Sequence, residues 1–176
     1  MTFASYISVF RMALIVPTIY SLKLNLEYLA LILFIIAGLT DYLDGYVARK
    51  TNTETSLGAL LDLLADKLLV CLILIWCAFS LNSMLIILPC LIIVSRELVI
   101  SSMRQFLVEK TGKNPIKVTY IAKSKTTIQI IAICFLILSP EMGTLFNKLS
   151  IALIWAAALV SIYTLYNYLI SYRHYF

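Results

Sequence analysis

The chain has 176 residues, of which 62% are hydrophobic and 13% charged, and its mean hydropathy is +0.97. This composition excludes a soluble globular domain, and we expect no nucleic-acid partner. A membrane-spanning helix needs about 20 apolar residues, so the length allows roughly six transmembrane helices. We therefore expect an all-α integral membrane protein with a single domain over residues 1–176.

Apolar runs predict helices, in chain order, over 6–22, 28–48, 58–81, 84–108, 116–139 and 146–172. Lysines and arginines lie unevenly around them. One side of the membrane would hold Lys23 and Lys148, and the other Arg49, Lys50, Lys110, Lys113, Lys117 and Arg173. By the positive-inside rule, we expect both termini and the connections 49–57 and 109–117 to be cytoplasmic. The four cysteines lack CxxC spacing, which argues against a zinc site or a disulfide framework.

All four aspartates of the chain lie between residues 41 and 66. On helices, Asp41 and Asp44 are spaced i,i+3 and Asp62 and Asp66 are spaced i,i+4, so each pair occupies one helix face. A charged side chain in hydrocarbon costs about 2.5–3.5 kcal/mol on insertion scales, so four carboxylates require a compensating cation. Carboxylate oxygens suit Mg²⁺ or Mn²⁺, and the absence of nearby His or Cys disfavours zinc.

Small residues accompany these aspartates. Gly45, Ala48 and Gly58 would let a ligand or a neighbouring backbone approach closely, and Arg49 is available to bind a phosphate. Two structural alternatives stand beside this interpretation. Glycines in membrane helices commonly mediate helix packing, and the carboxylates could pair with Arg49 or Lys67 in a structural ion-pair network.

The spacing DxxDGxxARx8GxxxDxxxD, from Asp41 to Asp66, resembles the signature of the CDP-alcohol phosphotransferase family at every fixed position. The resemblance implies six transmembrane helices around a polar cavity that faces the cytoplasm, and a homodimer. It also implies that Asp66 is the general base. The implied ligands of two divalent cations, Mg²⁺ or Mn²⁺, are Asp41, Asp44, Asp62 and Asp66, and the implied nucleotide pocket comprises Asp44, Gly45, Ala48, Arg49 and Gly58.

A second region, Ser95-Arg96-Glu97 through Arg104 followed by Ala122-Lys123-Ser124-Lys125-Thr126, is similar to the phosphatidylglycerophosphate synthase subgroup. The resemblance implies that the phosphate of glycerol 3-phosphate binds Arg96, Arg104, Lys123 and Lys125. A dianionic acceptor beside four carboxylates would be repelled without such cations. The structural alternatives are an Arg96–Glu97 pair and an Arg104 side chain that reaches the membrane interface. We leave Arg11 outside the site, since an anchoring role for the first helix accounts for it.

We therefore expect transfer of the phosphatidyl group from CDP-diacylglycerol to glycerol 3-phosphate, which gives phosphatidylglycerol phosphate and CMP. The expected location is a bacterial inner membrane, with the active site facing the cytoplasm and the lipid bilayer as surroundings. The alternative acceptors are phosphatidylglycerol, inositol phosphate and serine. A small cation carrier remains the alternative outside enzymes, because transport sites also use intramembrane aspartates.

Overall fold

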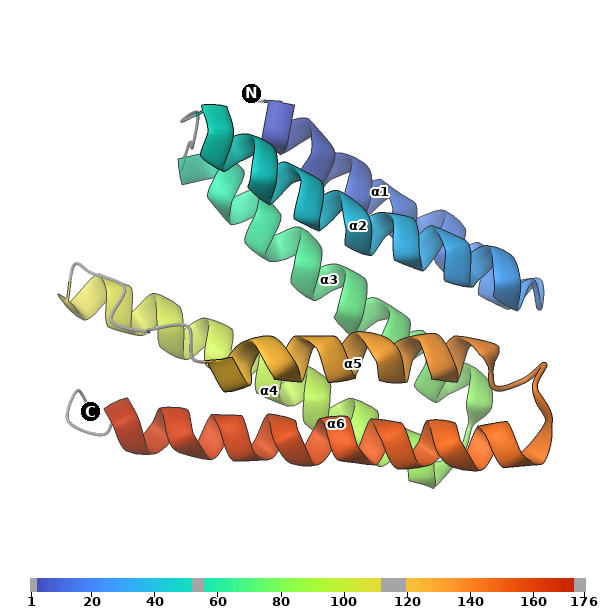
Figure 1. The fold of residues 1–176 in the computed structure, drawn as a ribbon. Helices are drawn as coiled ribbons and strands as arrows, with labels where there is room; N and C mark the ends of the chain where they lie inside the picture. Colours follow the sequence, from blue (N-terminus) through green and yellow to red (C-terminus); the bar gives the residue numbers. More distant parts are fainter. Residues whose placement is uncertain (1–2, 52–55, 112–119, 173–176) are drawn as a thin grey trace. The chain divides into compact units, whose positions relative to one another are not determined.

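The structure is a computed structural model that describes residues 3–51, 56–111 and 120–172 (Figure 1). All of the secondary structure within these ranges is helical, which confirms the prediction of an all-α chain with six helices. The helices are α1 (Phe3–Lys23), α2 (Glu27–Thr51), α3 (Ser56–Leu81), α4 (Met84–Thr111), α5 (Tyr120–Leu138) and α6 (Gly143–Tyr172). The chain divides into two compact units, residues 1–77 and residues 78–176.

In residues 1–77, α1 and α2 lie side by side along their length (Figure 1). Ala30, Phe34 and Ala37 of α2 are almost completely buried. Their spacing of three and four residues puts them on one helix face, as expected for an apolar stripe against a neighbouring helix. The two alanines are small, which favours close approach of helix backbones.

The turn between α1 and α2 follows from the local sequence. Asn25 adopts a positive φ of 55°, a conformation that asparagine tolerates better than most residues. The Leu26 N–H donates to the Ser21 carbonyl at 3.0 Å and the Asn25 N–H donates to the Leu22 carbonyl at 3.2 Å. These two bonds form a Schellman motif, which ends α1 and lets the chain reverse into α2.

In residues 78–176, α6 packs against both α4 and α5. The rings of Phe135 and Phe146 stack with centroids 4.8 Å apart, and the Ser150 hydroxyl donates to the Phe135 carbonyl at 3.0 Å. On the α4 side, the Trp155 indole N–H donates to the Leu85 carbonyl at 2.9 Å. These contacts fix α6 between its two neighbours, and α6 is therefore placed to contribute to any site that α4 and α5 share.

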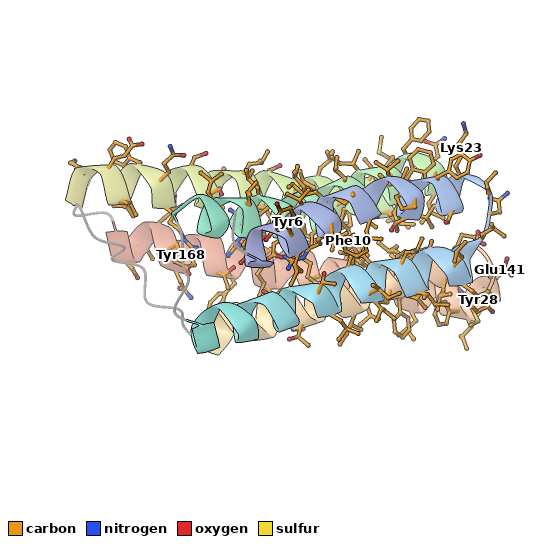
Figure 2. All side chains as sticks on the ribbon, turned by 90° about the horizontal axis from the view of Figure 1, so that it is seen from above. Tyr6, Phe10, Lys23, Tyr28, Glu141 and Tyr168 are labelled. Carbon is orange, nitrogen blue, oxygen red and sulfur yellow. The ribbon has the colours of Figure 1, made fainter. Side chains whose placement is uncertain are left out.

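Large apolar side chains remain exposed on the helices. Tyr6 and Phe10 of α1 and Tyr28 of α2 are among them, and Figure 2 labels all three among the side chains that surround this helix pair. Two described helices are long and apolar enough to cross a membrane, α4 over Met84–Lys110 and α6 over Gly143–Ser171. Exposed apolar surface on this scale fits a membrane protein, whose outer face contacts lipid.

Candidate functional site

The first candidate region comprises the end of α2 and the start of α3. Asp41, Asp44, Gly45, Ala48 and Arg49 belong to the continuous helix α2, as the predicted i,i+3 spacing requires. Their side chains lie outside the described residues, so their roles stay predictions. On α3, the half-buried Gly58 lies four residues before Asp62 and therefore on a similar helix face.

Asp62 and Asp66 converge on one cation. The Arg11 Nη1 atom donates to Asp62 Oδ1 at 3.2 Å and also to Asp66 Oδ1. The Arg11 side chain has no exposed surface, whereas the aspartate side chains are 42% and 47% exposed. The two carboxylates are therefore paired with a buried guanidinium and remain open to a further ligand.

Arg11 connects three helices at this point. In addition to the two aspartates of α3, it contacts α2, because its Nε–H donates to Thr40 Oγ1 at 3.5 Å. The Thr40 hydroxyl itself donates to the Ala37 carbonyl at 2.7 Å. Thr40 immediately precedes Asp41, so Arg11 lies close to both aspartate-bearing segments. The sequence interpretation as a helix anchor missed this position, although a single arginine within an apolar helix is itself a signal for a buried anionic partner.

The donor set fits a hard divalent cation. One oxygen from each of Asp62 and Asp66 accepts from the same nitrogen of Arg11, so the two carboxylates lie close together. Mg²⁺ and Mn²⁺ prefer such carboxylate oxygens. Among the side chains that the structure describes, no three acidic, His or Cys residues cluster, and the two remaining predicted ligands, Asp41 and Asp44, fall outside that set.

The second candidate region lies in residues 78–176 and contains a group of four residues that we call the Arg96 cluster: Arg96, Glu97, Lys125 and Thr164. Arg96 is 6% exposed and Lys125 is 4% exposed. The Glu97 Oε1 atom accepts from Arg96 Nη1 at 3.2 Å and also from Lys125 Nζ. Arg96 Nη2 donates to Thr164 Oγ1 at 3.0 Å. The cluster therefore joins α4, α5 and α6 through buried polar contacts.

Several buried donors in the same unit lack a described partner. The Nε–H groups of Arg96 and Arg104 have no hydrogen-bond acceptor among the described residues, and neither do Gln129 Nε2 and Ser161 Oγ. Buried polar groups are paired in most native structures, and an unpaired donor at a site is expected where a ligand completes its hydrogen bonds. Lys123, the fourth predicted phosphate ligand, has a side chain outside the described residues. Sequence reasoning had not singled out Thr164 at all.

Comparison with known proteins shows the family of this chain. The sequence model of the CDP-alcohol phosphatidyltransferase family matches residues 1–163, which include the first candidate region and every member of the Arg96 cluster except Thr164. The chain belongs to this family. Membership bears out the resemblance that the aspartate spacing indicated.

Relatives within the family are named CDP-diacylglycerol–glycerol-3-phosphate 3-phosphatidyltransferase. The protein from Rickettsia bellii is 35% identical over 178 residues, which cover 98% of this chain and 96% of that protein. The protein from Sodalis glossinidius is 30% identical over 97% of this chain and 94% of its own length. The protein from Escherichia coli strain K12 is 32% identical over 83% of this chain and 79% of its own length.

Proposed function

We propose that the protein transfers the phosphatidyl group of CDP-diacylglycerol to glycerol 3-phosphate and releases CMP. Family membership supports the CDP-dependent transfer, and the names of the relatives support this acceptor. The observation that carries the choice of acceptor is the Arg96 cluster, in which one carboxylate contacts two buried cations. A neutral acceptor would not require a buried cluster with an excess of positive charge, whereas a phosphate monoester would be bound by it.

The proposed chemistry is an in-line displacement at the phosphorus on the lipid side of the pyrophosphate. Asp41, Asp44, Asp62 and Asp66 would hold two divalent cations. These cations would neutralise the negative charge that develops on the CMP leaving group. Asp66 accepts the proton of the attacking glycerol hydroxyl. The hydroxyl oxygen bonds to phosphorus as the phosphoanhydride bond breaks, and CMP leaves with the electron pair.

The remaining residues bind the two substrates. The nucleotide pocket comprises Asp44, Gly45, Ala48, Arg49 and Gly58, where the small residues leave room for the ligand. The acceptor phosphate is bound by Arg96, Arg104, Lys123 and Lys125. Burial strengthens these charge-assisted hydrogen bonds, because the surroundings of Arg96 and Lys125 contain little water to compete for the phosphate.

The membrane arrangement is part of the same proposal. All six helices would span the bilayer as one domain, with both termini and the active site on the cytoplasmic side. The long apolar helices α4 and α6 and the distribution of lysine and arginine support this topology. The relatives named above come from bacteria, which supports a bacterial inner membrane. A homodimer is proposed from the family resemblance.

The test uses the purified full chain with CDP-diacylglycerol, Mg²⁺ and labelled glycerol 3-phosphate. CMP and labelled lipid are followed with and without a chelator, and both should appear only when the metal is available. CMP release with a different acceptor alone would keep the family chemistry and reject the acceptor. Absence of release with every acceptor would contradict the proposal and favour a cation carrier.

A further inference from the structure

Thr164 is the residue through which α6 contacts the Arg96 cluster. It is 4% exposed, and its hydroxyl accepts a hydrogen bond from Arg96 Nη2 at 3.0 Å. The same hydroxyl donates to the Ser161 carbonyl at 2.9 Å. A hydroxyl has a single proton, so this bond commits the proton to α6 and leaves the oxygen lone pairs for the guanidinium. The orientation of Thr164 is therefore fixed from its own helix.

The contacts of Arg96 determine the orientation of the whole guanidinium. Glu97 accepts from Nη1 and Thr164 accepts from Nη2, while the Nε–H has no acceptor among the residues that the structure describes. A guanidinium is planar and rigid, so two fixed terminal nitrogens also fix the direction of the Nε–H. Thr164 and Glu97 thus hold Arg96 with its unused donors in a defined direction, as bidentate recognition of a phosphate requires.

The side chain of Thr164 is uncharged, whereas that of Glu97 carries a negative charge. The carboxylate of Glu97 brings one negative charge to the two positive charges of Arg96 and Lys125. A second carboxylate at position 164 would also hold Arg96, but it would add a negative charge to the cluster and repel a phosphate dianion. A threonine hydroxyl orients the guanidinium without adding negative charge, so the cluster keeps its affinity for an anion.

We propose that Thr164 is a positioning residue for the acceptor site, which holds Arg96 in the orientation that binds the phosphate monoester of the acceptor. This inference rests on the proposed function, because it takes Arg96 as a ligand of the acceptor phosphate. It assigns to α6 a part in acceptor binding.

The test compares three substitutions of Thr164 with one matched control. Thr164→Val removes the hydroxyl at nearly constant size, and we expect KM for glycerol 3-phosphate to rise about tenfold, the value of one hydrogen bond to a charged group. KM for CDP-diacylglycerol and kcat should change by less than about twofold, because that hydrogen bond acts on the acceptor alone. Thr164→Ser keeps the hydroxyl and should restore KM, and Thr164→Cys, whose sulfur is a weak acceptor, should fall between.

The control is Thr18→Val. Thr18 is fully buried, and its hydroxyl donates to the Leu14 carbonyl of its own helix at 2.7 Å. This substitution removes a buried hydroxyl that does not contact Arg96, so all kinetic constants should stay within about twofold of wild type. Calorimetric titration of each protein with glycerol 3-phosphate measures acceptor binding directly and should reproduce the order of the KM values.

Four outcomes would overturn the assignment. An unchanged KM for glycerol 3-phosphate in Thr164→Val would do so, as would failure of Thr164→Ser to restore it. If Thr164→Val instead raised KM for both substrates equally, Thr164 would have only a structural role. The same would follow if Thr164→Val did not fold and Thr164→Cys bound the acceptor like wild type. These results leave the proposed function intact. A fifth outcome, a wild-type protein that used only acceptors without a phosphate, would overturn the proposed function and this inference with it.

Discussion

In residues 1–77 one buried cation, Arg11, contacts two half-exposed carboxylates, whereas in residues 78–176 one carboxylate, Glu97, contacts two buried cations. The described contacts therefore leave an excess of negative charge in the first region and of positive charge in the second. A charged group in a mostly apolar chain is stabilised when a ligand of opposite sign binds beside it. The first region thus suits a divalent cation and the second a phosphate.

The largest expected effect is on kcat and comes from substitution of the half-exposed Asp66 in the first region. Asp66→Asn should lower kcat by about 100-fold to 10,000-fold, because an amide cannot accept the proton of the attacking hydroxyl. Binding of CMP, measured by titration, should be partly retained, since the nucleotide pocket stays intact. The control is Glu109→Gln, the same acid-to-amide change at an exposed position on α4. Near-normal turnover of Asp66→Asn would remove Asp66 from the role of base.

The buried cation of the first region should matter chiefly for stability. Arg11→Met leaves Asp62 and Asp66 without this partner, and we expect a loss of about 2 kcal/mol in the free energy of unfolding, less than for a fully buried pair because both carboxylates are half-exposed. Added Mn²⁺ should recover more stability in this variant than in wild type, because a bound cation replaces the missing positive charge. Thermal unfolding with and without Mn²⁺ measures both effects.

The control for Arg11→Met is Lys23→Met, which removes an exposed charge at the end of the same helix and should leave the unfolding midpoint nearly unchanged. An Arg11→Met protein that lost stability without any additional response to Mn²⁺ would show that Arg11 and the metal do not share these carboxylates. The first region would then not be a site at which a cation compensates these two carboxylates.

The second region should respond through acceptor binding. Arg96→Ala and Lys125→Ala should each raise KM for glycerol 3-phosphate by about thirtyfold, because each removes a charge-assisted hydrogen bond. KM for CDP-diacylglycerol should remain close to wild type. Lys110→Ala, at an exposed position near the end of α4, serves as the matched control. If Arg96→Ala lost affinity only for CDP-diacylglycerol, the assignment of this region to the acceptor would be wrong.

The sequence predicted the helices well because long apolar runs determine them locally, and it located the aspartates because their spacing lies within helix turns. It did not predict the partners of buried charges. Arg11 meets Asp62 and Asp66 across 51 and 55 residues, and Arg96 meets Thr164 across 68. Contacts at such separations depend on which helices become neighbours, which periodicity alone does not specify. A lone arginine in an apolar run indicates that a partner exists but not which one.

The smallest expected effect distinguishes the two hydroxyls that contact buried arginines. Thr40 accepts from Arg11 at 3.5 Å, near the limit of a hydrogen bond, whereas Thr164 accepts from Arg96 at 3.0 Å. Arg11 is also held by two carboxylates, so loss of the Thr40 hydroxyl should barely change its orientation. We expect Thr40→Val to alter KM for either substrate by less than about threefold, measured beside Thr164→Val. If Thr40→Val and Thr164→Val changed KM equally, the Thr40 hydroxyl would orient Arg11 as the Thr164 hydroxyl orients Arg96. The two carboxylates would then not be what orients Arg11.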